Sequence, residues 1–106
     1  MTYETLLFDV AEGVATVTLH RPDAANTINL QMAKDLYDAA TRCADDPGVR
    51  AVIVTGSGKL FSGGGDIGSF AAAGDGFSRL LRDITASLHV AVARLLQMDA
   101  PVVCAV

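Results

Sequence analysis

The stretch from Gly56 to Phe70 reads GSGKLFSGGGDIGSF, and it lies between an apolar strand-like segment and a long helical pattern. Its three consecutive glycines, Gly63–Gly65, have no Cβ atoms, so another molecule can approach this backbone closely. Phe61 and Ile67 flank the glycines as apolar anchors, which argues against a flexible linker because linkers are usually polar throughout. The stretch therefore predicts a fixed loop that presents backbone N–H and C=O groups to a ligand.

Three kinds of ligand use glycine-rich loops. The dinucleotide pattern G-x-G-x-x-G occurs from Gly63 to Gly68, but Asp66 places a negative charge where the pyrophosphate would lie. The triphosphate-binding loop requires Ser or Thr after its lysine, whereas Leu60 follows Lys59. The remaining use is the donation of backbone hydrogen bonds to a developing oxyanion, for which glycine leaves the N–H unobstructed.

Composition indicates a folded, acidic protein. Of the 106 residues, 51% are hydrophobic and 19% are charged, which is typical of globular domains and excludes a disordered chain. A net charge of −4 favours neither nucleic acid nor an anionic membrane as a partner. The apolar segment 84–106 is interrupted by charged residues, so we expect no membrane span.

The two cysteines, Cys43 and Cys104, are far apart and form no metal-binding or redox motif. Both lie in apolar patterns, so we expect buried, reduced thiols, as in a cytoplasmic protein. The N-terminus has no signal-peptide pattern.

Hydrophobic periodicity predicts an α/β fold with the element order β-β-α-β-α-β. The expected elements are a hairpin of strands 6–10 and 14–20, a helix capped by Asn29 and stopped at Asp45–Gly48, a strand at 51–55 buried on both faces, a helix at 77–98 and a buried strand at 102–106. Residues 71–76 are small and unpatterned, which predicts a mobile connection.

The first helix has two predicted faces. Its core face contains Met32, Leu36, Ala39, Ala40 and Cys43, and its solvent face contains Lys34, Asp35, Asp38 and Arg42.

The segment Leu60–Ile67, LFSGGGDI, resembles the F-[SC]-A-G-A-D-[LI] signature of the crotonase (enoyl-CoA hydratase/isomerase) superfamily. Four further blocks are similar to the family at the right spacing: VTLHRP at 17–22, NTIN at 26–29, DPGVRAVIVTG at 46–56 and APVVCAV at 100–106. Five ordered blocks cover nearly the whole chain, which is far more specific than any one of them.

This resemblance implies the crotonase ββα spiral, of which residues 1–106 are expected to be the N-terminal part of a single domain. The chain is then expected to be truncated before the second oxyanion-hole segment, the catalytic carboxylates and the helices that build a homotrimer or a dimer of trimers.

The resemblance also implies the site residues. Gly65 matches the first oxyanion donor, at a position where the signature has alanine. The segments expected to bind acyl-CoA contain Ala24, Ala25, Asn26, Ser62, Gly63, Gly64, Gly65, Asp66 and Ile67, with Asp66 also a candidate helix cap.

Charged residues near these segments have simpler expected roles. Many relatives have Lys or Arg at the position of Ala24, and Arg21 is expected either to replace that phosphate contact or to pair with Asp23. His20, His89, Asp75 and Asp83 are expected to be structural or surface residues.

The leading hypothesis is an acyl-CoA-processing enzyme that stabilises a thioester enolate, most simply a hydratase of trans-2-enoyl-CoA. It requires no metal and no cofactor, because acyl-CoA is the substrate. The alternatives are another crotonase reaction (isomerase, hydrolase or decarboxylase) and a non-catalytic acyl-CoA-binding or assembly fragment. A nicotinamide-dependent enzyme is disfavoured by the misplaced glycine pattern.

Overall fold

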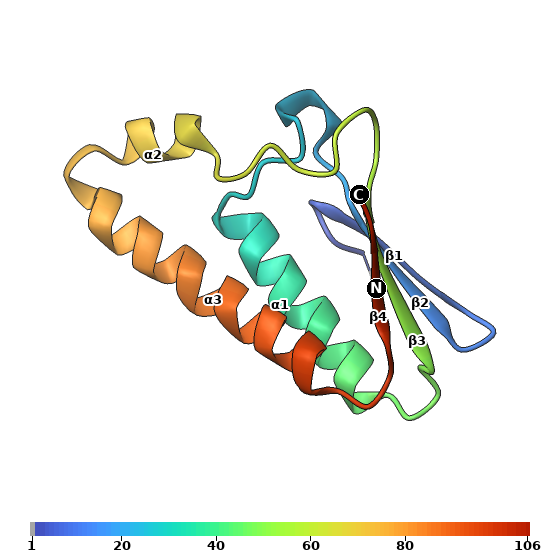
Figure 1. Cartoon of the computed structure of the whole chain (residues 1–106). Helices are drawn as coiled ribbons and strands as arrows, with labels where there is room; N and C mark the ends of the chain where they lie inside the picture. The colour runs from blue at the N-terminus through green and yellow to red at the C-terminus, as the bar shows by residue number, and fades with distance from the viewer. Residues whose placement is uncertain (1) are drawn as a thin grey trace.

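The computed structural model describes residues 2–106 and shows a four-stranded sheet with two long helices packed on it (Figure 1). In chain order the elements are β1 (Leu6–Ala11), β2 (Val14–Leu19), a 3-10 turn (Pro22–Ala24), α1 (Leu30–Asp45), β3 (Ala51–Gly56), α2 (Ile67–Ala73), a second 3-10 turn (Gly74–Gly76), α3 (Phe77–Gln97) and β4 (Val102–Ala105). The predicted order of strands and long helices is confirmed.

The sheet has the strand order β1-β2-β3-β4. The strands β1 and β2 form an antiparallel hairpin, whose turn is closed by Glu12 and Gly13 with positive φ angles of 54° and 82°. The strand β3 is parallel to both β2 and β4. The carboxyl ends of β2, β3 and β4 therefore lie at one edge of the sheet.

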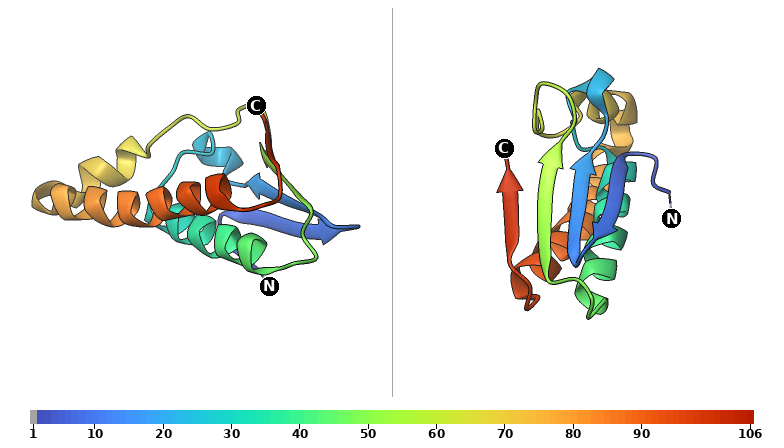
Figure 2. Two further views of the ribbon diagram at one scale, coloured as in Figure 1. Left: turned by 60° about the horizontal axis from the view of Figure 1, so that its bottom comes forward. Right: turned by 90° about the vertical axis from the view of Figure 1, so that its right-hand side faces the viewer.

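Figure 2 shows that α1 and α3 cover one face of the sheet and leave the other open. The core lies under the helices and contains, among others, Leu6, Ala15, Val17, Leu19, Met32, Ala39, Cys43, Val52 and Val54.

The predicted burial of β3 and β4 is wrong. Along β3 only Val52 and Val54 are buried, because no helix covers the opposite face. β4 pairs with β3 on one side only, and Val103 is 59% exposed. Cys104 is likewise exposed, while Cys43 is buried as predicted.

The helix α1 begins as the sequence predicts, because the side chain of Asn29 accepts a hydrogen bond from the Met32 N–H at 2.9 Å. The prediction for Asp35 is wrong, since it is only 6% exposed. Its carboxylate accepts hydrogen bonds from the N–H of Thr5 at 3.0 Å and from its hydroxyl at 2.6 Å. These two hydrogen bonds satisfy the buried carboxylate and tie the N-terminal segment to α1.

The predicted connection 71–76 is helical instead. Residues 71–73 complete α2, and 74–76 form the second 3-10 turn. Alanine is the best helix former, so a run without apolar periodicity can still be helical when the adjacent elements pack. Here the rings of Phe70 and Phe77 meet edge to face, with centroids 5.6 Å apart.

Within residues 2–106 no helix is long and apolar enough to cross a membrane.

Candidate functional site

Two loops meet at the carboxyl edge of the parallel strands. The first, residues 20–29, follows β2, and the second, residues 57–66, follows β3. They pair through a parallel bridge between Ile28 and Gly65. Two further bonds join them, from the Gly63 N–H to the Ala25 carbonyl at 2.8 Å and from the Ser62 hydroxyl to the Asn26 carbonyl at 2.9 Å. The structure thus brings together the two segments that the sequence predicts to form one site.

The buried amide of Asn26 joins these loops from inside. It is 1% exposed, and its Nδ2 donates to the carbonyls of Ser57 and Leu60, each at 2.8 Å. Its Oδ1 accepts from the N–H of Arg21 at 2.7 Å. Asn26 therefore positions the two loops, because its side chain points into the protein and both its polar atoms form hydrogen bonds with the backbone.

The free N–H of Gly65 is the most distinctive feature of the glycine loop. The carbonyl of Gly64 accepts from the Ile28 N–H at 2.7 Å, and the Asp66 N–H donates to the Ile28 carbonyl at 3.1 Å. A trans peptide points its N–H opposite to its C=O, so the N–H of Gly65 points away from Ile28. Among residues 2–106 this N–H has no acceptor, and Gly65 is exposed.

Arg21 and Asp66 connect the two loops at the same point. The guanidinium of Arg21 donates to the Thr27 carbonyl at 2.6 Å and forms an ion pair with Asp66 at 3.3 Å. The sequence-based alternatives for Arg21, a phosphate contact or a pair with Asp23, miss this internal role.

Asp66 occupies the N-cap position of α2, as expected, but no side-chain capping bond forms. Its carboxylate instead accepts from the Ser69 hydroxyl at 2.9 Å as well as from Arg21. The Ser69 hydrogen bond is the main cause that lowers the pKa of Asp66, and Arg21 lowers it further. Asp66 is thus held as a carboxylate that fixes the loop.

A cavity of about 460 Å³ lies between the two loops. It is lined by Pro22, Asp23, Ala25, Asn26, Ser57, Gly58, Lys59 and Leu60. Lys59 is the only cation among these lining residues, and it is exposed. The sequence pattern alone relates Lys59 only to a triphosphate loop and does not predict this position. The available signal was the place of Lys59 directly before the Leu60–Ile67 segment.

Four side chains that the sequence predicts to be structural or on the surface do not line this cavity: His20, His89, Asp75 and Asp83. His20 Nδ1 lies 3.0 Å from the Ser57 hydroxyl, so it supports the second loop. His89 and Asp75 are exposed, and Asp83 pairs with Arg79 on the surface of α3. No group of three potential metal ligands occurs in the described part of the chain.

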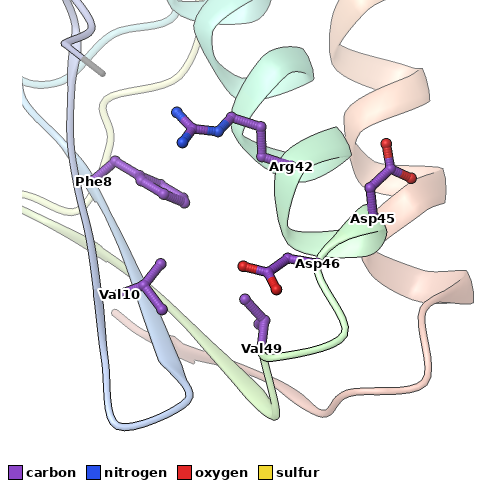
Figure 3. A pocket seen from close by; sticks show the side chains of 6 residues that line it. All are labelled: Phe8, Val10, Arg42, Asp45, Asp46 and Val49. Atoms are coloured by element: carbon purple, nitrogen blue, oxygen red, sulfur yellow. The ribbon is translucent and has the colours of Figure 1, made fainter.

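A second cavity, of about 290 Å³, lies at the opposite edge of the sheet, where β3 begins (Figure 3). Phe8, Val10 and Val49 form its apolar side, and Arg42, Asp45 and Asp46 its charged side. The Arg42 guanidinium lies 5.1 Å from the centroid of the Phe8 ring, a cation–π contact that fixes both side chains.

Comparison with known proteins gives a consistent match. The family described as enoyl-CoA hydratase/isomerase matches residues 9–106. A probable enoyl-CoA hydratase of Mycobacterium bovis is 46% identical over 67 residues, which are 63% of this chain and 26% of that protein. A trans-2-decenoyl-[acyl-carrier-protein] isomerase of Streptococcus mutans is 34% identical over 67 residues, again 63% and 26%.

The crystal structure of an enoyl-CoA hydratase/isomerase from Xanthobacter autotrophicus superposes with a TM-score of 0.83 at 33% identity, covering 99% of this chain and 39% of that one. The superposition confirms that this chain has the N-terminal part of the predicted crotonase-type architecture. The matched stretch thus spans 26% of the two curated relatives named above.

Proposed function

Because the chain belongs to the enoyl-CoA hydratase/isomerase family, we propose that the complete protein adds water to a trans-2-enoyl-CoA thioester. The observation that carries this proposal is the unpaired N–H of Gly65, held in a loop whose neighbouring peptide groups are bonded to Ile28.

The chemistry needs such a donor. Water adds to C3 of the enoyl group, the electron pair of the double bond moves toward the thioester oxygen, and an enolate forms before C2 is protonated. A fixed N–H stabilises the charge that develops on that oxygen, and one donor contributes about 3 kcal/mol. Asp66 is bonded to Arg21 and Ser69, so we assign the acid–base step to carboxylates outside these 106 residues.

The nucleotide end of the coenzyme is assigned to the cavity between the two loops. Its walls include Ala25 and Asn26, next to the Ser62–Gly64 backbone, and its cation is Lys59. Arg21 is occupied by Thr27 and Asp66, so Lys59 is the residue we assign to the coenzyme phosphates. Ala24 and Ile67 do not line this cavity, and Ile67 is 77% exposed.

Isomerisation of the double bond is the second candidate, supported by the similarity to the Streptococcus mutans isomerase. Isomerisation removes a proton from C4 and forms a dienolate, whereas hydration forms the enolate of the 3-hydroxyacyl thioester. Negative charge develops on the thioester oxygen in both reactions, so the N–H of Gly65 serves both. Product analysis with a trans-2-enoyl-CoA separates hydration from migration of the double bond. Saturable acyl-CoA binding without either product would indicate the non-catalytic alternative.

The deciding variant is Gly65→Pro, which removes the N–H. In the complete protein we expect kcat to fall about 100-fold or more, because the donor acts on charge that develops in the transition state. Affinity for acetoacetyl-CoA, measured by calorimetry, should fall much less.

The melting temperature of Gly65→Pro must stay near that of the wild type, so that loop distortion is excluded. A folded variant with near-normal turnover would show that Gly65 is not the donor. Absence of saturable acetoacetyl-CoA binding to the wild type at millimolar concentration would remove the acyl-CoA assignment as well.

A further inference from the structure

The bare Cα of Gly65 faces the ring of Phe70. A methyl group added to Gly65 would lie 2.9 Å from both Cε2 and Cζ of Phe70, whereas ordinary contacts of such a carbon begin near 3.4 Å. The aromatic ring thus occupies the space that a side chain at position 65 would need.

Phe70 is itself held in place. It lies on α2, is half-buried, and meets the ring of Phe77 edge to face at an interplanar angle of 67°. Phe77 is the first residue of α3, the long helix that packs along α1. Contacts therefore connect the helical layer to Gly65 through two aromatic rings.

The backbone at Gly65 is then limited by three contacts. The peptide group before it is bonded through the Gly64 carbonyl to Ile28, and the one after it through the Asp66 N–H to the same residue. The third is the Phe70 ring, which occupies the space that a Cβ on Gly65 would need. A glycine has broad conformational freedom, so without the ring the Gly64–Gly65 peptide could rotate more easily about its flanking bonds.

We propose that Phe70 is a positioning residue that fixes the direction of the Gly65 N–H. The inference rests on the proposed function, in which this N–H donates to the thioester oxygen. Phe70 acts through Gly65 and is not required to touch the reacting atoms. A role limited to joining α2 to α3 would change stability but would leave the hydrogen bond to a bound thioester unaltered.

The test compares the complete wild-type protein with Gly65→Ala, Phe70→Leu and the double variant. Gly76→Ala serves as the control, because a methyl group there meets no atom within 4 Å. Two quantities are measured: kcat with a short trans-2-enoyl-CoA, and the infrared stretching frequency of the labelled carbonyl in bound [1-¹³C]butyryl-CoA, which decreases as its hydrogen bond strengthens.

We expect each single variant to lower kcat about 10-fold or more, with a smaller change in KM. On binding to either variant, the carbonyl frequency of the labelled thioester should decrease less than it does on binding to the wild type. In the double variant the new methyl group fills part of the space left by the shortened side chain. Both quantities should therefore recover toward the wild type, and Gly76→Ala should match the wild type throughout.

Additive losses in the double variant, or a normal carbonyl frequency in Phe70→Leu, would overturn the inference. If Gly65→Ala does not fold, the frequency in Phe70→Leu alone decides. A wild-type protein that turns over enoyl-CoA while the two losses add would refute only the role of Phe70. A wild-type protein without turnover and without a frequency decrease would refute the proposed function, and this inference with it.

Discussion

Asn26 shows how one buried polar residue can hold two loops together. Its amide pairs with backbone groups of three residues, two of them more than 30 positions away in the sequence. Buried backbone groups without partners are costly, so this amide fixes where both loops lie. The loop that contains Gly65 depends on the geometry that Asn26 imposes.

The variant Asn26→Ala is therefore expected to destabilise the protein by about 2–4 kcal/mol, because it leaves the Ser57 and Leu60 carbonyls and the Arg21 N–H unpaired. The matched control is Asn29→Ala, which removes one helix cap and should cost about 1 kcal/mol. Chemical denaturation of the complete protein measures both. Equal losses in the two variants would contradict the role assigned to Asn26.

At the scale of elements, α2 is attached to the rest of the molecule at its start and at its centre. Its first turn is tied to the loop after β2 by the Asp66–Arg21 ion pair, and its centre packs on α3 through Phe70 and Phe77. In Figure 1 α2 lies at the outer end of α3, away from the strands. This element is therefore held by a few specific contacts, and the ion pair among them depends on pH.

The pH dependence follows from the lowered pKa of Asp66. The folded value is below the ordinary 3.8, chiefly because of the Ser69 hydrogen bond, so the carboxylate stabilises the folded state above pH 3.8. This contribution is lost as pH falls through the lowered folded value. Between about pH 6 and pH 2.5 the wild type should thus lose more stability than Asp66→Asn, which has no such carboxylate to protonate.

Thermal melts at both pH values provide the measurement. Asp75→Asn is the matched control, because Asp75 is exposed and its side chain has no ion pair or hydrogen bond within residues 2–106. The control should lose stability to acid as the wild type does. An identical acid response of Asp66→Asn and wild type would show that the interactions of this carboxylate with Ser69 and Arg21 contribute nothing to folding.

At the scale of the whole molecule, the sheet has one covered and one open face (Figure 2). Leu7 and Val103 are 51% and 59% exposed on the strands at its two edges, and Val106 is 96% exposed. Both edge strands also present unpaired backbone groups, which favour association with other chains.

We therefore expect residues 1–106, expressed alone, to be poorly soluble or partly molten. The expected signs are binding of a hydrophobic dye, a broad thermal transition and association detected by sedimentation. Replacing Val103 with Lys should increase the soluble fraction, because a charge on an edge strand opposes pairing. A sharp, cooperative melt of a soluble monomer would contradict this expectation.

The sequence by itself determined the features that depend on neighbouring residues. The hairpin of the first two strands, the Asn29 cap and the long periodic helix α3 each follow from local patterns, and the structure confirms them. Five ordered blocks also determined the family, because glycine allows backbone conformations that other residues rarely adopt and proline fixes φ.

Only the tertiary structure decided which side chains meet across long separations. Asp35 is buried by Thr5, 30 residues away, and Arg21 pairs with Asp66, 45 residues away, although both read locally as surface charges. The packing of Phe70 on Gly65 and the exposure of β4 likewise depend on how the layers assemble. Periodicity reports which face of an element is apolar, whereas the partner of a charge or a ring is set by distances that exist only after the chain has folded.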